Sequence, residues 1–555
     1  MNRLVTLALL QVMTVPIAPW RIQHSLIVLA LRAALILAII ALGACAGLPT
    51  GVVRPPSTAR SDLSGTHLAA VARASLASSA AEASGFRLLP TGTEALTARL
   101  ALAQRAQRTL DLQYYQLAHD HSGLHVLRSL HAAAQRGVRV RLLVDDLYAG
   151  GQDGLLAGLA AQPNIEVRLF NPLPARDGMV ASRIVRSLHE FDRINRRMHN
   201  KLFVADNAWS ISGGRNIADE YFDRAEPAHF IDLDILAAGA VVSEQSAVFD
   251  RYWNNAQAYP VASLLPQSAS VAALRQNFER AITKVGARTN APVPTLDGPA
   301  GAPNCALPCE LDSGALTLHL AAAQVLADAP DKNSIDDDHA SPTVAARYQA
   351  LLDSAHNEVL LTTPYFVPGS GGLAALRAAA QRRVALSVVT NSLATTDEPL
   401  VHAGYARYRQ ALLAAGVRLF ELMPSLTRTA ERTPVGSTGY GSMGSMGRLH
   451  AKLAVVDRRW LFIGSMNLDR RSALINTEAA LLIDSPALAA EAAQLLHAER
   501  TLASYRLQLS SDDHRIEWVA GNGPAAQVHA TEPDASAGQR LRLWLASQFV
   551  AEDLL

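Results

Sequence analysis

The chain has 555 residues, 49 % of them hydrophobic, and a formal net charge of +1. This length exceeds one ordinary domain and predicts two packed lobes with ample core to bury. The near-neutral charge argues against the broad electrostatic footprint that drives nucleic-acid binding, so any attraction to phosphate must be local.

The first 45 residues have the layout of an export signal. Arg21 and Arg32 precede an apolar run over 33–42, and the tetrapeptide Leu-Gly-Ala-Cys then ends at Cys45. That tetrapeptide resembles a bacterial lipoprotein box, and the resemblance implies lipidation of Cys45. The alternative is an uncleaved membrane anchor over about 26–48, which Arg32 would interrupt at appreciable cost.

Two segments predict breaks in the fold. Residues 46–82 are rich in Ala, Ser, Thr and Pro without a convincing apolar period, and they predict a flexible tether. Residues 290–313 carry five prolines among glycines and alanines and predict a linker. The close pair Cys305 and Cys309 lies in this linker, and the sequence leaves open whether the two are bonded.

The two remaining parts of the chain repeat one order of elements. Residues 110–146 predict a strand, a helix and a strand, and residues 358–392 repeat that order. Such alternation implies parallel pairing. We therefore predict an α/β fold of two pseudo-symmetric lobes, residues 83–289 and 314–555, each a mixed, mostly parallel sheet flanked by helices. We expect one active site at their interface, and a C-terminal tail at the end of the second lobe.

One motif occurs in each lobe with identical spacing. Lobe one contains RRMHNKLFVADNAWSISGGRN and lobe two contains GRLHAKLAVVDRRWLFIGSMN. The recurring positions are His199, Lys201, Asp206, Gly213 and Asn216 in lobe one, and His450, Lys452, Asp457, Gly464 and Asn467 in lobe two. Five such positions arise by chance about once in ten thousand chains of this length. A lone histidine on a strand is usually a packing residue, but duplication at fixed spacing overturns that interpretation.

The motif spacing predicts a hairpin. Positions two apart on a strand share a face, so each His projects together with its Lys. The predicted antiparallel register sets each His opposite its Asn and places Gly214 and Ser465 opposite the lysines, where small residues leave room for a phosphate. Asp206 and Asp457 belong to the catalytic set by their place in the motif. At the predicted turns, however, capping of the hairpin is the favoured role.

Each motif offers one base or nucleophile, one cation and one amide, which suits half of a phosphodiester site. One imidazole attacks phosphorus while the other protonates the departing alkoxide, and the protonation roles reverse as an alcohol or water attacks the phosphohistidine. The candidate phosphate-binding residues are Lys201, Asn216, Lys452, Ser465 and Asn467. Because the lysines supply positive charge and no carboxylate cluster matches, we expect no metal and no cofactor.

A nucleophilic histidine needs an acceptor on its second ring nitrogen, usually a carboxylate. Glu478 and Asp232 each precede a predicted strand downstream of a motif. We assign Glu478 to His450 and Asp232 to His199 as orienting residues, with Asp234 as the competitor of Asp232.

These motifs resemble those of the phospholipase D superfamily, the HKD enzymes, and the similarity is close to the bacterial cardiolipin synthase branch. FNPLPARDG, GGRNIADEYF, TTPYFVPG and GSMNLDRRSALINTE carry it over nearly the whole mature chain. The resemblance implies phosphatidyl transfer between two glycerophospholipids, with phosphatidylglycerol as a substrate and phosphatidylethanolamine as a candidate partner. It also implies that His199 is the nucleophile and His450 the general acid. Gly214, where lobe two has Ser465, departs from the pattern.

The leading hypothesis is a phosphatidyltransferase anchored on the extracytoplasmic side of a bacterial membrane. A hydrolase that releases phosphatidic acid differs only in whether water or a lipid alcohol attacks. A metal-independent nuclease is disfavoured by the charge and the export signal, so no nucleic-acid partner is expected, and the oligomeric state is unknown. The basic stretch 183–201 predicts either a solvated helix face or a rim for anionic headgroups. Tyr115, Tyr365 and Phe366 are candidates to line the cleft, with core packing as the alternative.

Overall fold

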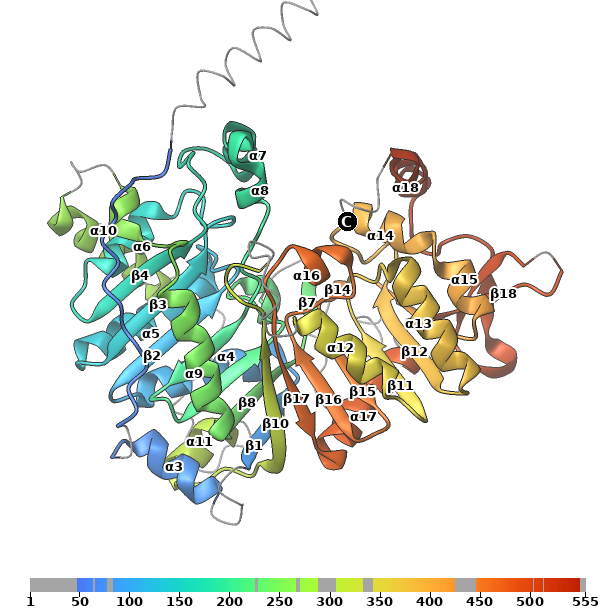
Figure 1. Ribbon diagram of the computed structural model, residues 1–555, viewed down its shortest axis with the longest axis horizontal. Helices are drawn as coiled ribbons and strands as arrows, with labels where there is room; N and C mark the ends of the chain where they lie inside the picture. The colour runs from blue at the N-terminus through green and yellow to red at the C-terminus, as the bar shows by residue number, and fades with distance from the viewer. Residues whose placement is uncertain are drawn as a thin grey trace, which may run out of the picture.

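The computed structural model describes residues 47–62, 65–76, 83–224, 228–265, 270–287, 306–332, 343–424, 446–502, 504–512 and 514–549. Two lobes lie side by side (Figure 1). Cys45, Cys305 and the predicted export signal lie outside the described residues, and Cys309 is disulfide-bonded. Within the described part, no helix combines the length and the apolar character needed to cross a bilayer.

The sheet strands of lobe one are β1 (Ser84–Leu89), β2 (Thr109–Tyr114), β3 (Arg139–Asp145), β4 (Ile165–Phe170), β5 (Leu202–Ala205), β6 (Trp209–Gly213), β8 (Asp234–Gly239) and β9 (Ala258–Pro260). Those of lobe two are β10 (His319–Ala327), β11 (Glu358–Thr362), β12 (Ala385–Asn391), β13 (Arg418–Leu422), β15 (Leu453–Val456), β16 (Trp460–Gly464), β17 (Ala479–Asp484), β18 (Ser504–Leu509), β19 (Ile516–Ala520) and β20 (Gln527–His529). Two further strands, β7 (Ala228–Ile231) and β14 (Met446–Leu449), pair with each other.

The two lobes have the same strand order. Across lobe one the order is β1, β8, β6, β5, β2, β3, β4, β9, and across lobe two it is β10, β17, β16, β15, β11, β12, β13, β18. The strand-helix-strand units pair in parallel, as predicted, and antiparallel strands extend them. Antiparallel pairing of β1 with β10 joins the halves into one 18-stranded sheet among the described residues. The predicted α/β class with two related lobes is confirmed.

The helices of lobe one are α3 (His67–Ser75), α4 (Gly92–Arg105), α5 (His121–Gln135), α6 (Asp153–Ala160), α7 (Val180–Arg186), α8 (Phe191–Ile194), α9 (Ala240–Trp253), α10 (Val271–Ala287) and α11 (Ala306–Ser313). Those of lobe two are α12 (Val344–Asp353), α13 (Gly369–Gln381), α14 (Pro399–Ala406), α15 (Arg409–Ala414), α16 (Arg470–Leu474), α17 (Pro486–Leu502) and α18 (Ala537–Phe549).

The helix starts follow from local sequence. Thr91 and Glu94 form a capping box at α4, and the Asp120 side chain caps α5. Every residue of β2 is buried, because helices cover both faces of the parallel strands.

A shared core holds the lobes together. One apolar cluster combines residues of β1, β8 and α9 with residues of β15, β17 and α17. In addition, α9 contacts β10 of lobe two, and α17 contacts β1 of lobe one. The lobes therefore do not pack as independent domains, and a site built from both can be held rigidly.

Parts of the predicted tether and linker are ordered. Residues 67–75 form α3, whose Leu68 and Val71 are buried, and Thr66 caps its N-terminus. Residues 306–313 form α11, where Asp312 binds Arg105 of α4. Residues 67–75 are therefore helical within the segment predicted as a flexible tether, and the predicted linker ends in a helix, because a short apolar stripe is enough once a larger surface is present to bury it.

Candidate functional site

The segment before each motif histidine pairs with the other lobe. Strand β14, which leads to His450, runs parallel to β7 of lobe one, and the His450 N–H donates to the Ile231 carbonyl at 2.8 Å. In the other direction, the His199 N–H donates to the Thr477 carbonyl at 2.9 Å. Each histidine is thus placed by backbone hydrogen bonds to the opposite lobe.

These exchanges bring each histidine to a carboxylate of the other lobe. Nδ1 of His199 lies 3.0 and 3.1 Å from the Glu478 carboxylate oxygens, and Nδ1 of His450 lies 2.6 Å from Asp232 Oδ2. The sequence-based assignment, Glu478 to His450 and Asp232 to His199, is wrong. Thr477 and Ile231, whose carbonyls bind the opposing histidines, directly precede the two acids, so each acid reaches across the interface.

Asp234, the competitor, serves a structural purpose. Its carboxylate pairs with the buried Arg99 at 2.8 Å and accepts the Arg215 N–H at 3.3 Å. The buried guanidinium of Arg99 therefore draws Asp234 away from the histidines.

The electrostatics keep both imidazoles neutral. Burial and the charges of Lys201 and Lys452 lower the pKa of His199 to about 4, although Glu478 acts to raise it. Burial and the same two lysines, against Asp232, lower the pKa of His450 to about 3. Because both lysines act on both rings, the two motifs share one site.

The orienting acids remain ionised. Burial favours the neutral acid, but the neighbouring His450 and Lys452 outweigh it and bring the pKa of Asp232 down to about 2. His199 and Lys201 likewise hold the pKa of Glu478 below its usual value against burial. An ionised carboxylate on Nδ1 fixes the proton there, which leaves Nε2 as the free base on each ring.

The lysines lie beside their histidines, as their spacing predicts. Nζ of Lys201 donates to the His199 carbonyl at 2.6 Å, and Nζ of Lys452 donates to the His450 carbonyl. Burial lowers the pKa of Lys452 to about 8 and that of Lys201 well below its usual value. Both ammonium groups are poorly solvated, so an incoming anion gains a strong interaction with them.

The two motif asparagines differ in their surroundings. Asn216 donates to the Tyr221 hydroxyl at 2.9 Å and accepts the Gln116 N–H at 3.2 Å. The buried Oδ1 of Asn467, in contrast, has no hydrogen-bond partner among the described residues. Existing hydrogen bonds therefore already fix the orientation of the Asn216 amide.

The hairpin register differs from the prediction by one residue. Strands β5 and β6 pair Leu202 with Ser212, and β15 and β16 pair Leu453 with Ile463, so Gly213 and Gly464 lie opposite the lysines. A Cβ added to Gly213 would lie 2.4 Å from Asp234, and one added to Gly464 would lie 2.3 Å from the Ala479 carbonyl. These glycines permit close approach of the next strand.

The neighbouring small residues accommodate the acids rather than the phosphate. A Cβ on Gly214 would lie 2.2 Å from the Asp232 carboxylate. The equivalent Ser465 donates its hydroxyl to Glu478 and accepts the Ala479 N–H at 3.0 Å. The structure therefore shows Ser465 as a partner of Glu478 and not as a direct phosphate ligand. Lobe one has Gly214 at this position and lobe two has Ser465 because the two residues face different acids, Asp232 and Glu478.

Asp206 and Asp457 lie at the hairpin turns, at the far ends of β5 and β15 from the lysines. Asp206 accepts three backbone N–H groups, those of residues 107–109, at 2.8 to 2.9 Å. Asp457 accepts those of residues 356–358 at 2.7 to 2.9 Å. Both carboxylates tie the turn to the start of β2 or β11. Their inclusion in the catalytic set is corrected to this capping role.

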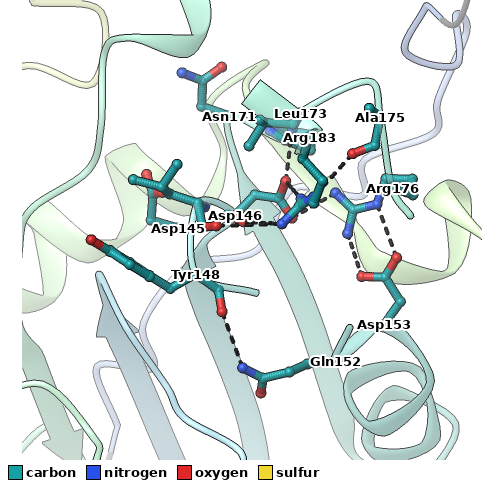
Figure 2. Close-up of polar contacts among 12 residues, drawn as sticks. Asp145, Asp146, Tyr148, Gln152, Asp153, Asn171, Leu173, Ala175, Arg176 and Arg183 are labelled. Atoms are coloured by element: carbon teal, nitrogen blue, oxygen red, sulfur yellow. Dashed lines mark hydrogen bonds and ion pairs between the residues drawn. The ribbon is translucent and has the colours of Figure 1, made fainter. Parts of the chain in front are cut away.

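A further pair of polar residues supports the segments before the histidines. Asp145, at the end of β3, accepts the Met198 N–H at 2.9 Å, and Asn391, at the end of β12, accepts the Leu449 N–H at 2.9 Å. Figure 2 shows Asp145 beside its neighbour Asp146. Neither residue was among the candidates predicted from the sequence, although each is a polar residue that ends a run of apolar strand positions.

Aromatic rings surround the imidazoles. Tyr115 lies edge-on to His199 with ring centroids 5.0 Å apart, while Tyr221 and Phe230 lie 5.0 and 4.9 Å from His450. Of the two alternatives left open by the sequence, lining of the cleft or core packing, Tyr115 lines the site and Phe366 is a buried core residue. The rings exclude water from the imidazoles and contribute to their low pKa values.

Comparison with known proteins identifies the family. Residues 100–253 and 348–499 match the family described as "Cardiolipin synthase, PLD-like domain". The chain is 36 % identical to cardiolipin synthase C of Escherichia coli over 472 residues, which cover 84 % of this chain and 95 % of that protein. It is 24 % identical to cardiolipin synthase A of Pseudomonas fluorescens over 78 % of this chain and 72 % of that protein.

A solved structure, the phosphatidylserine synthase of Haemophilus influenzae, superposes with a TM-score of 0.53 at 12 % identity, over 84 % of this chain and 94 % of that one, which shows a shared fold. The fold and the paired motifs define a phospholipase D-type enzyme. The chain belongs to the phospholipase D superfamily, in the family of cardiolipin synthase-like proteins.

Proposed function

We propose that this protein is a phosphatidyltransferase that makes cardiolipin from two glycerophospholipids through a phosphohistidine intermediate. Phosphatidylglycerol is the proposed acceptor, because its headgroup carries the hydroxyl that attacks in the second step. Phosphatidylglycerol or phosphatidylethanolamine is the proposed phosphatidyl donor, which loses glycerol or ethanolamine in the first step. The observation that carries the proposal is the pair of neutral, buried imidazoles, each with Nδ1 on an ionised carboxylate of the opposite lobe and each under the charge of both lysines.

The first step uses one ring as nucleophile and the other as acid. Nε2 of His199 attacks phosphorus, the bond from phosphorus to the headgroup oxygen breaks, and that oxygen takes a proton from His450. Unliganded His450 has a pKa of about 3, but a bound phosphate diester brings a negative charge beside it, which raises that pKa toward the protonated form. Lys201 and Lys452 stabilise the charge on the remaining phosphate oxygens.

The second step regenerates the enzyme. His450, now neutral, takes the proton of a hydroxyl group on the second lipid, and the resulting oxygen attacks phosphorus as the bond to His199 breaks. With phosphatidylglycerol as both substrates, the products are cardiolipin and glycerol. If water attacks instead, the product is phosphatidic acid, so the alternative hydrolase shares every residue of the site.

Product analysis separates the two outcomes. Purified enzyme is incubated with phosphatidylglycerol labelled in its free glycerol headgroup and in its acyl chains. We expect acyl label in cardiolipin and equimolar free labelled glycerol. Phosphatidic acid as the sole lipid product refutes the transferase proposal in favour of the hydrolase.

We also propose that the protein acts on the extracytoplasmic side of a bacterial membrane as a lipoprotein. The support is the signal-like sequence that ends at Cys45, and the insolubility of the proposed substrates. Mass analysis of the mature N-terminus tests this. We expect a chain that begins with a lipidated Cys45, and an unprocessed N-terminus contradicts it.

A further inference from the structure

Large apolar side chains are exposed together on two separate helical segments. The first runs from Met179 through α7 to Phe191, and its Met179 is 81 % exposed. The second is α18, whose Trp544 is 60 % exposed. The other exposed apolar side chains of these segments are Val185, Leu188, Leu541 and Leu545. Single exposed apolar residues are ordinary, but clusters of this kind mark interaction surfaces.

The two segments project on the same side of the molecule. In Figure 1, α7 and α8 stand above lobe one and α18 stands above lobe two, with α16, β7 and β14 between them. β14 leads directly to His450, and Arg471 of α16 donates to Asn195, the residue that follows α8, at 2.8 Å. The two apolar segments therefore flank the elements that hold the site.

A further exposed ring connects this side to the histidine. Tyr148, 41 % exposed, lies edge-on to Tyr115 with ring centroids 5.3 Å apart, and Tyr115 in turn contacts His199. Two further exposed leucines are Leu400 of α14, a helix that contacts α18, and Leu474 of α16. An exposed aromatic ring is thus in contact with the ring that touches His199.

A buried ionic network fixes the orientation of α7. Arg183 is fully buried, where its guanidinium binds Asp146 and donates to the Ala175 carbonyl at 3.0 Å (Figure 2). Arg176 binds Asp146 from the other side and also binds Asp153. Because Arg183 holds one face of α7 against the lobe, the orientation of the helix is fixed. The exposure of Met179 and Val185 follows from that orientation and not from loose packing.

Some arginines of the basic stretch 183–201 are held in ion pairs, and one is exposed. Arg183 and Arg197 are buried on Asp146 and Asp145, and Arg193 pairs with Glu190. Arg186 of α7 is exposed, as is Arg542 of α18. Exposed cations beside exposed apolar residues on each segment suit a surface that carries both hydrocarbon and negative charge.

We propose that the 179–191 segment and α18 form a two-point docking surface for a lipid bilayer that contains anionic lipids. The apolar side chains enter the interface between headgroups and acyl chains, where Trp544 is well suited, and Arg186 and Arg542 meet lipid phosphates. Docking at two points places the bilayer across the elements that carry both histidines. This inference rests on the proposed function for its choice of a lipid over a protein partner.

Hydrogen exchange on the full-length chain tests the docking without turnover. The His199→Ala variant is mixed with vesicles of equal parts phosphatidylcholine and phosphatidylglycerol. We expect slower amide exchange in peptides from 179–191 and from α18, and unchanged exchange in α10 and β20. Unchanged exchange in both helical segments overturns the proposal, including the case in which the N-terminal segment alone binds the vesicle.

Kinetics give the second test. A variant with Met179→Ser, Phe191→Ser, Leu541→Ser and Trp544→Ser is compared with a control, Val271→Ser and Val528→Ser, which removes exposed apolar residues from α10 and β20. We expect the first variant to show an apparent KM for phosphatidylglycerol in vesicles that is raised at least about tenfold, and the control to behave as wild type.

Short-chain phosphatidylglycerol, dissolved as monomers, distinguishes docking from chemistry. We expect both variants to turn it over at the wild-type rate. Equal loss on monomers and vesicles, or wild-type kinetics on vesicles, overturns the docking surface. If the wild-type enzyme turns over neither substrate, the proposed function fails instead, and hydrogen exchange still decides the docking.

Discussion

The crossed pairing of histidines and acids yields a sharp prediction. Glu478→Gln keeps the size of the side chain but removes the charge that accepts the His199 Nδ1–H. Although Glu478 belongs to lobe two, the substitution should weaken the nucleophile of lobe one. Asp232→Asn is the matched variant, and it should weaken the acid function of His450.

The structure sets the size of the effect. The Glu478 carboxylate is fully buried and lies 3.0 and 3.1 Å from His199 Nδ1, and it also accepts the Ser465 hydroxyl. A hydrogen bond to a charged group contributes about 1.5–3 kcal/mol. Since about 1.4 kcal/mol corresponds to a tenfold change in rate, the attack on phosphorus should slow about 10- to 100-fold.

The assay uses a phosphatidyl ester of p-nitrophenol and follows the first turnover. Nitrophenolate departs without needing a proton, so the burst reports nucleophilic attack and does not depend on the general acid. Glu478→Gln should slow the burst about 10- to 100-fold, whereas Asp232→Asn should leave it within about twofold of wild type. Asp232→Asn should still slow turnover of phosphatidylglycerol, whose leaving group needs protonation.

The reverse pattern would refute the reasoning. If Asp232→Asn slowed the burst and Glu478→Gln did not, the assignment of His199 as the nucleophile oriented by Glu478 would be wrong. Circular dichroism and thermal unfolding of both variants control for loss of the fold.

Three further predictions follow from the supporting residues and the pKa values. Asp206→Ala removes three hydrogen bonds from a hairpin turn, so denaturant unfolding should show a loss of about 3 kcal/mol in the free energy of unfolding. The kcat per folded molecule should be unchanged, and a large fall in kcat contradicts the capping role. Asp145→Asn keeps an acceptor for the Met198 N–H and should lower kcat less than Asp145→Ala, with little change in KM for either variant, and equal loss in the two variants excludes this positioning role. For the p-nitrophenol ester, which does not need the His450 proton, His199 must be neutral and Lys452 charged, and their pKa values are about 4 and about 8. The kcat/KM for this ester should therefore rise through pH 4 and fall no later than pH 8, where Lys452 loses its proton. A profile that is flat from neutral to strongly alkaline pH excludes the lysine charge as a requirement.

The sequence by itself determined the repeat, the α/β class and the identity of the four His and Lys residues. These features are local: a strand repeats every two residues, so the spacing of His and Lys fixes a shared face wherever the strand lies. The order strand, helix, strand likewise forces parallel pairing in each lobe, which β2 and β3 show.

Only the tertiary structure decided which acid serves which histidine. His199 and Glu478 are 279 positions apart and His450 and Asp232 are 218 apart, so no local period relates them. The pairing follows instead from the exchange of backbone hydrogen bonds between the lobes at Thr477 and Ile231. The tertiary structure also decided the hairpin register, which differs by one residue from the predicted one: Gly213 lies opposite Lys201, where close packing against Asp234 requires a residue without a Cβ.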